Sequence, residues 1–496
     1  MSFFDRLRDK ARPALDSLAG AVDADRALQL AMAAFIERAR ETYPAMPYAR
    51  WRQGDPLKLL FAGYSGTRNT GADVRVEEMI RQFRHVLGDG NLDLTILVHD
   101  PKLTRGYFRT AKQVQMPRVF PKFLYDTVAD QHGMVACEGS MFKSKFASAL
   151  STFMVGTLGL ASAGDKLSIA YGGEAGKMDP GLEALVRKYC ADSFVITRNQ
   201  ESRDVLAKLD IPSRLGTDTA WTFEPAPDAV GRGLLRDAGW DGESPVLVAC
   251  PINPFWWPVR PDVTKAAAHA LLGLHDREHY GSIYFHAGSP EIDEKQERYL
   301  DAYGAAIETF RRRHKVFVVC VGMEQLDREA CDGLSARLGG APIFASDQTE
   351  MFELVSVLRQ ATYMVSSRYH GIVTCMPAGV LSVGVTMDER IRNLMADRGT
   401  PELAIEVEDP DLSTQILAAL EQVAANPDET RRGIERTVVR SLRMMGHMGV
   451  LLAQHVHDRL PRFPLPDGMG HADAYHHLPA LPPRVRELIE THREHV

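Results

Sequence analysis

The chain has 496 residues, of which 45% are hydrophobic and 25% are charged, and its formal net charge is -7. This length exceeds what one hydrophobic core usually supports, so we expect two core-bearing domains with some additional helices. The mildly negative charge argues against a nucleic-acid partner, because nucleic-acid-binding surfaces are usually basic. Local arginines must therefore hold any anionic ligand.

The six cysteines are scattered, with no Cys-x-x-Cys pair and no Cys/His spacing suited to zinc. We therefore expect a reducing compartment, no metal and no cofactor. Residues 1–6 lack the continuous apolar core of a secretion signal. These features together predict a cytoplasmic location.

Residues 1–55 carry apolar positions at helical spacing, which predicts an N-terminal helical segment that packs on the body of the protein. A helix on a membrane surface is the alternative, because Phe3 and Phe4 lie near Arg6 and Arg8. Peripheral membrane association therefore remains open at this stage.

Residues 56–225 alternate short apolar runs with helical stretches, which is typical of βαβ units around a parallel sheet. This region is predicted to form a first Rossmann-like α/β domain, ending at a Pro-rich linker. The uncharged run 146–164 approaches transmembrane length, but its Ser, Thr and Gly content favours a buried helix. The predicted strands are residues 59–64, 92–98, 134–139 and 167–173, and an amphipathic helix is predicted over 74–87.

Residues 240–405 repeat this pattern and predict a second Rossmann-like α/β domain. Two such units in succession predict a cleft between them, with ligands bound outside the carboxyl ends of the strands. The predicted strands are residues 246–250, 282–288, 316–322 and 363–366.

Residues 406–460 have a helical pattern and are expected to brace the two domains. Residues 461–496 are rich in Pro, Gly and His, which predicts a solvated tail. Metal binding by His471, His476 and His477 is the less favoured alternative, because no cysteine accompanies them.

The loop after the first predicted strand reads Gly-Tyr-Ser-Gly-Thr-Arg-Asn-Thr-Gly-Ala-Asp over residues 63–73. Its glycines permit tight turns that point backbone N–H groups at a ligand, and the following helix adds a positive dipole end. The loop suits a phosphate or a carboxylate, although it lacks the spacing of a dinucleotide site and the Lys of a P-loop. A plain tight turn is the alternative interpretation.

A second loop combines a fixed cation with a titratable imidazole. Arg368 can grip a phosphate or carboxylate in two places, and His370 can give up a proton near neutral pH. Ser366 and Ser367 add hydroxyls that can cap the following helix. The alternatives are a structural ion pair for Arg368 and a core histidine for His370.

Four motifs follow one another between residues 59 and 398: Gly-Tyr-x-Gly-x-x-Asn-Thr-Gly over 63–71, Thr-Arg-Asn-Gln-Glu-Ser over 197–202, Asp-Thr-Ala over 218–220 and Ser-Arg-Tyr-His over 367–370. In sequence and in order, they resemble the motifs of the polysaccharide pyruvyl transferases. The resemblance implies a GT-B-like pair of Rossmann-type domains and transfer of pyruvate from phosphoenolpyruvate to sugar hydroxyls without a metal. The acceptor would be a sugar or a lipid-linked glycan of the cell envelope, as in exopolysaccharide biosynthesis.

The resemblance also implies roles for individual residues. Arg368 and His370 stand where the family binds phosphoenolpyruvate and supplies an acid, and Asp73 stands near a candidate base. Ala72, an insertion before that aspartate, is expected to displace it, and Arg198 matches its family motif only in part. The implied catalytic residues are His370, Arg368 and Asp73, and the implied substrate-binding residues are Gly66, Asn69, Gly71, Arg198 and Ser367.

Two other functions remain open. A nucleotide-sugar glycosyltransferase can use the same fold, and a non-catalytic glycan-binding relative would tolerate the inserted Ala72. Trp256 and Trp257, after a predicted strand of the second domain, can either stack on sugar rings or anchor one domain on the other.

Overall fold

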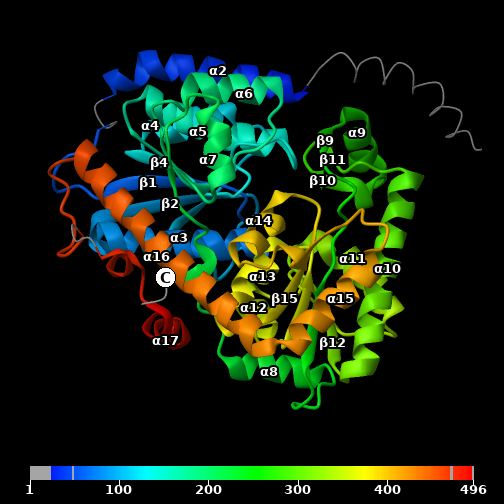
Figure 1. The fold of residues 1–496 in the computed structure, drawn as a ribbon. Helices are drawn as coiled ribbons and strands as arrows, with labels where there is room; N and C mark the ends of the chain where they lie inside the picture. The colour runs from blue at the N-terminus through cyan, green and yellow to red at the C-terminus, as the bar shows by residue number, and fades with distance from the viewer. Residues whose placement is uncertain (1–23, 47–49, 470–472, 494–496) are drawn as a thin grey trace, which may run out of the picture.

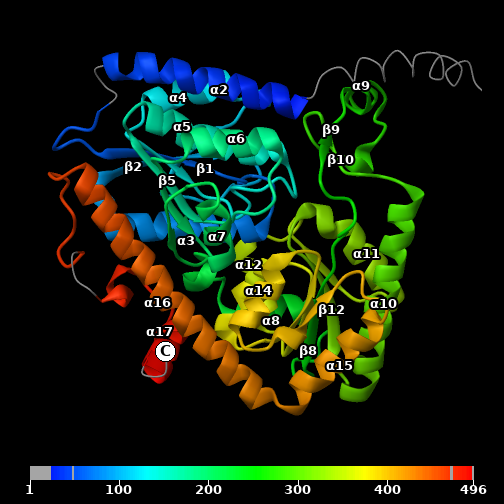
Figure 2. The same ribbon diagram turned by 45° about the horizontal axis from the view of Figure 1, so that its top comes forward.

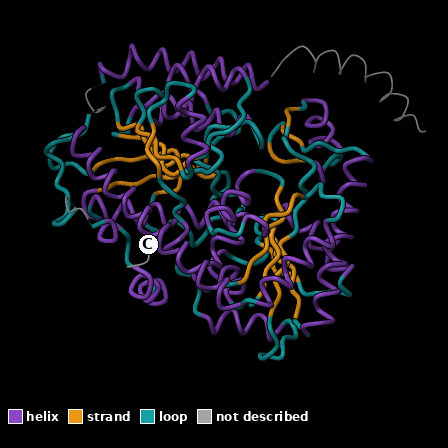
Figure 3. The backbone as a smooth tube through the Cα atoms, viewed as in Figure 1, coloured by secondary structure: helices purple, strands orange, loops and turns teal. Residues whose placement is uncertain are grey.

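The computed structural model describes residues 24–46, 50–469 and 473–493. Two separate parallel sheets, each covered by helices, confirm the predicted α/β fold with two Rossmann-like, GT-B-like domains (Figures 1 and 3). Phe3 and Phe4, for which a helix on a membrane surface was the alternative, lie outside the described residues.

The first sheet has the order β3-β2-β1-β4-β5-β6-β7, and all of its strands are parallel. Its strands are β1 (Leu57–Ala62), β2 (Leu92–Val98), β3 (Lys112–Gln115), β4 (Gly133–Ala136), β5 (Leu167–Gly173), β6 (Phe194–Thr197) and β7 (Ser213–Leu215). Its helices are α3 (Thr70–Leu87), α4 (Pro121–Ala129), α5 (Ser148–Ala163), α6 (Pro180–Tyr189) and α7 (Gln200–Ala207), with 3-10 turns η2 (Asp89–Asn91) and η3 (Ala220–Thr222).

The second sheet has the order β13-β12-β8-β14-β15-β16 and is also parallel. Its strands are β8 (Val246–Cys250), β12 (Phe317–Gly322), β13 (Ile343–Ala345), β14 (Tyr363–Ser366), β15 (Leu381–Thr386) and β16 (Ala404–Glu406). Its helices are α8 (Asp228–Asp237), α10 (Pro290–His314), α11 (Arg328–Arg337), α12 (Met351–Arg359), α13 (Tyr369–Cys375), α14 (Glu389–Asp397) and α15 (Leu412–Ala425), with 3-10 turns η5 (Gln325–Asp327), η6 (Met376–Ala378) and η7 (Pro401–Leu403).

The prediction of a parallel strand over residues 282–288 was wrong. The segment belongs to a small antiparallel sheet, β10-β11-β9, inserted after β8. Ser282 adopts a φ of 55° and lets the chain turn back within a hairpin, so the apolar run never crosses the domain. The insertion comprises β9 (Arg260–Pro261), α9 (Val263–Leu272), η4 (Asp276–Glu278), β10 (His279–Gly281) and β11 (Tyr284–Phe285).

Both large sheets reverse their strand order next to their first strand. The reversal lies between β1 and β4 in the first sheet and between β8 and β14 in the second. Ligands of open α/β sheets bind at such points, outside the carboxyl ends of the strands. The loops after these four strands therefore mark where a site is expected, and they include both loops singled out in the sequence.

Helix α5 confirms that the uncharged run is a buried helix. The N-terminal helix α2 (Ala24–Thr42) packs on it with Met32 and Ile36, both fully buried. Gly156 and Gly159 permit this close approach, because a Cβ at either position would lie within 2.7 Å of Met32 or Ile36. Among the described residues, none of the helices has the length and apolar content needed to cross a membrane.

The long helix α16 (Pro427–Arg459) returns from the second domain and runs along the first (Figures 1 and 2). Its Met448 packs against Gly216, where an added Cβ would lie 2.8 Å from the sulfur. Gln82 of α3 donates a hydrogen bond of 2.7 Å to the carbonyl oxygen of Met445. Helix α16 also packs on β15 and η6 of the second domain, so it contacts both domains, as predicted for the C-terminal helices.

The prediction of a solvated tail after residue 460 was wrong for the described part. The segment forms η8 (Ala474–His477) and α17 (Pro483–His492). Val485 and Leu488 of α17 are buried. These few apolar residues suffice to dock the short helix, despite the Pro-rich composition of the segment. His477 is also buried, and its ring nitrogens hydrogen bond backbone oxygens, whereas His471 lies outside the described residues.

Candidate functional site

The loop after β1 is a tight turn whose shape depends on its sequence. Gly66 and Arg68 have φ angles of 82° and 57°, and the glycine adopts such a value at no steric cost. Asn69 caps α3, because its side chain accepts a hydrogen bond of 3.1 Å from the N–H of Ala72. Gly66 and Asn69 therefore build the turn and set the direction of the helix.

Gly71 brings the first domain against the second. A Cβ added to Gly71 would lie 2.4 Å from Nδ1 of His370, so the imidazole packs directly on the first turn of α3. The N–H of Thr70 also donates a hydrogen bond of 2.8 Å to the carbonyl oxygen of Met323, in the second domain. The structure thus joins the two loops that the sequence singled out.

His370 faces a buried carboxylate. Its Nε2 lies 3.2 Å from Oδ2 of Asp218, and the histidine side chain is 15% exposed whereas that of Asp218 is 0% exposed. The same Asp218 oxygen accepts a hydrogen bond of 3.0 Å from Arg198. An imidazole held by a carboxylate and open to solvent on one side can transfer a proton to a ligand.

A buried network of charges surrounds this pair. Arg198 also binds Glu174 at 2.6 Å, and Lys143 binds the other oxygen of Glu174 at 2.6 Å. Arg75, fully buried, has its Nε 3.6 Å from Asp218. Burial alone would raise the pKa of both carboxyls, but Arg198 and Lys143 hold the pKa of Glu174 at about 2. His370, together with Arg75 and Arg198, holds the pKa of Asp218 well below its usual range. Both carboxylates therefore stay ionised at neutral pH.

Arg368 is held by a different pair of carboxylates. Its Nε donates a hydrogen bond of 2.8 Å to Asp327, and Nη2 donates one of 2.8 Å to Glu324. Burial raises the pKa of Asp327 to about 6, against the opposing effect of Arg368. The structure therefore places Arg368 in the ion pair that was the alternative interpretation, with its Nη1 making no hydrogen bond to a described residue.

Ser367 is turned into the second domain. Its side chain is almost fully buried, and its hydroxyl lies 2.8 Å from the hydroxyl of Tyr299. Its N–H donates a hydrogen bond to the carbonyl oxygen of Cys250, at the end of β8. Ser367 thus positions the loop that carries Arg368 and His370.

Asp73 does not share the side of α3 that faces His370. An α-helix turns by about 100° per residue, so Asp73 projects about 200° away from the position where Gly71 meets the imidazole. Asp73 is 1% exposed, and neither of its carboxyl oxygens has a side-chain hydrogen-bond partner in the described part of the chain. Burial raises its pKa well above the usual range, which favours a protonated, uncharged carboxyl.

Glu138 is an acidic residue that the sequence interpretation did not assign to the site. It follows β4 at the strand reversal, and the neighbouring Gly139 packs on Arg198, where an added Cβ would lie 3.0 Å from the guanidinium. Glu138 is partly exposed, and its Oε2 has no hydrogen-bond partner among the described residues. Asp218 was also left out of the predicted site, although its Asp-Thr-Ala motif was visible.

One of the two tryptophans, Trp257, packs against the first domain. Trp256 is buried and stacks on His286, with ring centroids 4.0 Å apart. Trp257 meets Phe146 of the first domain edge-on, at 5.2 Å between centroids. These contacts favour the second of the two interpretations of the tryptophans.

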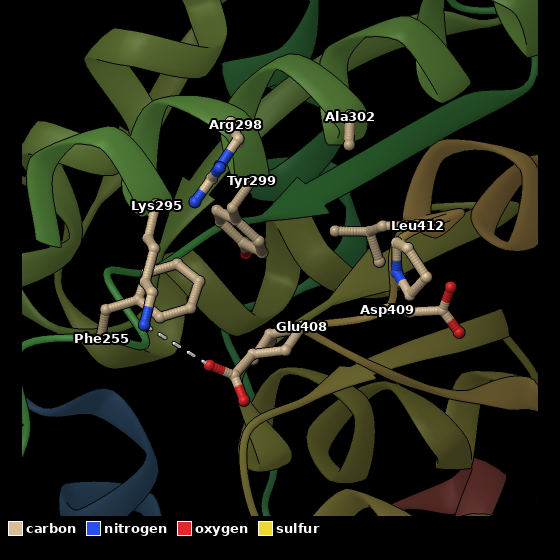
Figure 4. Close-up of a pocket in the computed structure, with 10 residues that line it drawn as sticks. Phe255, Lys295, Arg298, Tyr299, Ala302, Glu408, Asp409 and Leu412 are labelled. Atoms are coloured by element: carbon tan, nitrogen blue, oxygen red, sulfur yellow. Dashed lines mark ion pairs between the residues drawn. The ribbon is translucent and has the colours of Figure 1, made fainter. Parts of the chain in front are cut away.

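Two cavities lie near these loops. One, of about 360 Å³, is lined by both domains and reaches from the turn after β1 to the inserted sheet. The other, of about 370 Å³, lies within the second domain, where Lys295 is 3.9 Å from Glu408 across the opening (Figure 4). Of these two, the first has walls from both halves of the molecule, as expected of a site between two Rossmann-like domains.

The fold and the site define a class: a two-domain α/β protein with an imidazole, a carboxylate and buried cations gathered where both sheets reverse. A family model described as polysaccharide pyruvyl transferase matches residues 84–389. The chain belongs to that family, which is a family of transferases.

No curated protein matches the chain. Solved structures overlap with it weakly, and at this level of similarity they carry no argument about function. They include a UDP-GlcNAc 2-epimerase from Neisseria meningitidis (11% identity, 81% of this chain, 100% of that chain, TM-score 0.49), a putative UDP-N-acetylglucosamine 2-epimerase from Listeria monocytogenes (10%, 81%, 96%, 0.49) and a sucrose-phosphate synthase from Thermosynechococcus elongatus (12%, 82%, 98%, 0.48).

Proposed function

We propose that this protein transfers pyruvate from phosphoenolpyruvate to a sugar hydroxyl of a cell-surface glycan or its precursor. The observation that carries the proposal is the pair of His370 and Asp218, partly open to solvent at the contact between the two domains. Membership of the polysaccharide pyruvyl transferase family supports the reaction type. All six cysteines are buried and free, which supports a cytoplasmic setting.

The charges around His370 suit an anionic donor. Arg75, Lys143 and Arg198 form ion pairs there with Glu174, Asp218 and Glu389. Nη1 of Arg75 has no hydrogen-bond partner among the described residues. Phosphoenolpyruvate carries a phosphate and a carboxylate, so fixed cations beside His370 support its binding in a protein of negative net charge.

The reaction can be written with the residues in place. His370, protonated beside Asp218, gives its proton to the methylene carbon of phosphoenolpyruvate, and the central carbon becomes electrophilic. A sugar hydroxyl attacks that carbon and loses its proton to a base. The bond from carbon to the phosphate oxygen then breaks, phosphate leaves, and a second hydroxyl of the sugar closes the ketal.

We assign the base to Glu138 in place of Asp73. Asp73 is buried and its raised pKa favours the protonated form, so it cannot readily accept a proton. Glu138 is partly exposed and has an oxygen with no hydrogen-bond partner among the described residues. Its neighbour Gly139 contacts Arg198, which places Glu138 beside the charged network of His370.

A binding and turnover experiment tests the proposal. Phosphoenolpyruvate and a set of sugar nucleotides are titrated against the protein, and phosphate release is then followed with a panel of cell-envelope glycans. We expect saturable binding of phosphoenolpyruvate and glycan-dependent phosphate release, both reduced in a folded His370→Ala variant. Saturable binding of a sugar nucleotide alone would instead favour the glycosyltransferase alternative.

A further inference from the structure

The cavity shared by the two domains is lined by aromatic and polar residues that have no part in the proposed donor site. Two tyrosine rings line it, Tyr64 from the turn after β1 and Tyr280 from the inserted sheet, and they stack on each other with ring centroids 6.0 Å apart and planes within 5°. Phe120 and Leu150 add apolar surface to the same wall. Flat aromatic surfaces with a polar edge suit ligands that are apolar on one face and polar around the rim.

Polar groups converge on the same space. His99, which follows β2, lines the cavity, and its ring meets that of Tyr64 edge-on at 5.8 Å. Its Nε2 is buried and has no hydrogen-bond partner among the described residues. Burial lowers the pKa of His99 to about 4, so the ring is neutral and can donate or accept one hydrogen bond. The hydroxyl of Thr67 lines the cavity as well.

The cavity is connected to the proposed reaction centre. The hydroxyl of Tyr64 donates a hydrogen bond of 2.9 Å to Glu324, and Glu324 in turn holds Arg368, two residues before His370. The turn that begins at Tyr64 ends at Gly71, which touches the His370 ring.

We propose that this cavity binds a pyranose ring of the acceptor glycan, with one face of the sugar against the stacked pair of Tyr64 and Tyr280 and a hydroxyl bonded to His99. Its volume of about 360 Å³ lies within the range of small-ligand sites. A purely apolar occupant such as a lipid chain would leave the buried Nε2 of His99 unpaired, which is unfavourable. The inference rests on the proposed function, because it names the acceptor site of that reaction.

The test measures sugar binding without phosphoenolpyruvate. Methyl pyranosides of glucose, galactose, mannose and N-acetylglucosamine are titrated by saturation-transfer NMR against the wild-type protein and variants. We expect saturable binding of at least one glycoside, weakened about tenfold in Tyr280→Ala and kept in Tyr280→Phe, which retains the aromatic face. Tyr475→Ala is the matched control, because Tyr475 lies on η8, away from the cavity.

A second variant keeps the test decisive if Tyr280→Ala does not fold. Gly281 lines the cavity and has open space where a Cβ would be, so Gly281→Trp should fill the cavity without a clash in the backbone. We expect it to abolish glycoside binding while leaving the thermal shift caused by phosphoenolpyruvate unchanged. Binding to neither wild type nor Tyr280→Phe, or equal binding in Gly281→Trp, would overturn the inference. If phosphoenolpyruvate causes no thermal shift in the wild-type protein, the proposed donor is wrong. The glycoside titrations then still decide whether the cavity binds a sugar.

Discussion

Substituting Gly71 by alanine tests the contact that joins the two domains at the site. The added Cβ would lie 2.4, 2.6 and 2.7 Å from three atoms of His370, whereas non-bonded carbon and nitrogen atoms prefer about 3.5 Å or more. The imidazole must therefore retreat by about 1 Å. A displacement of that size at a reacting group costs about a hundredfold in turnover.

Two opposing contributions determine how Gly71→Ala changes the free energy of unfolding, so the net change should be small. Alanine improves a helix over glycine by about 0.5–1 kcal/mol, whereas overpacking a tight contact costs about 1–3 kcal/mol. We therefore expect Gly71→Ala to be folded and destabilised by about 1 kcal/mol, as measured by denaturant unfolding. The assay is phosphate release from phosphoenolpyruvate with the glycan that supports the wild-type reaction.

Gly233 provides the matched control. It is also a helical glycine, in α8, but nothing lies within 4 Å of the position that a Cβ would occupy. Gly233→Ala should keep wild-type turnover and gain a little stability. Wild-type turnover in a folded Gly71→Ala protein would refute the reasoning, because it would mean that the position of His370 against α3 does not matter.

Other substitutions probe the charges. Asp218→Asn should lower turnover by about a hundredfold or more, seen in the same phosphate assay, because the imidazolium loses its carboxylate. Glu138→Gln should lower turnover while leaving the phosphoenolpyruvate thermal shift unchanged, and a weakened shift would contradict its role as a base. Arg368→Ala should cost about 3–5 kcal/mol of unfolding free energy, because Glu324 and Asp327 lose their partner; adding Asp327→Asn should restore part of it. Since burial raises the pKa of Asp327 to about 6, the folded protein keeps a proton there that the unfolded chain releases. Unfolding free energy should therefore fall by up to about 3 kcal/mol as pH rises from about 4 to 6. If the unfolding free energy of Asp327→Asn falls with pH as steeply as that of the wild type, this assignment is wrong.

Much of the fold could be predicted because its strands are short apolar runs that end in turns. The bounds predicted for β2, β5, β8 and β14 match the structure, since each is a buried central strand with a clear hydrophobic pattern. The edge strand β7 (Ser213–Leu215) was missed because it is short and only partly buried. The hairpin of β10 and β11 was misread because its apolar run resembles a central strand and its turn depends on Ser282, which carries no glycine signal.

The candidate site was only partly visible in the sequence for a different reason. The positions of His370 and Gly71 followed strands and could be anticipated, but the contact between them depends on how two domains meet. The pairing of Arg368 with Glu324 and Asp327 spans more than forty residues and has no local pattern. The side of α3 on which Asp73 lies could be judged only once the start of the helix was fixed at Thr70.

The central claim is that His370 and its neighbours move a pyruvyl group onto a glycan. The most direct measurement incubates the protein with phosphoenolpyruvate carrying isotope-labelled carbon and analyses the glycan by mass spectrometry. The account predicts that the label enters the glycan as a pyruvyl ketal with the wild-type protein and fails to enter with a folded His370→Ala variant. Labelled glycan produced at an undiminished rate by His370→Ala would contradict it.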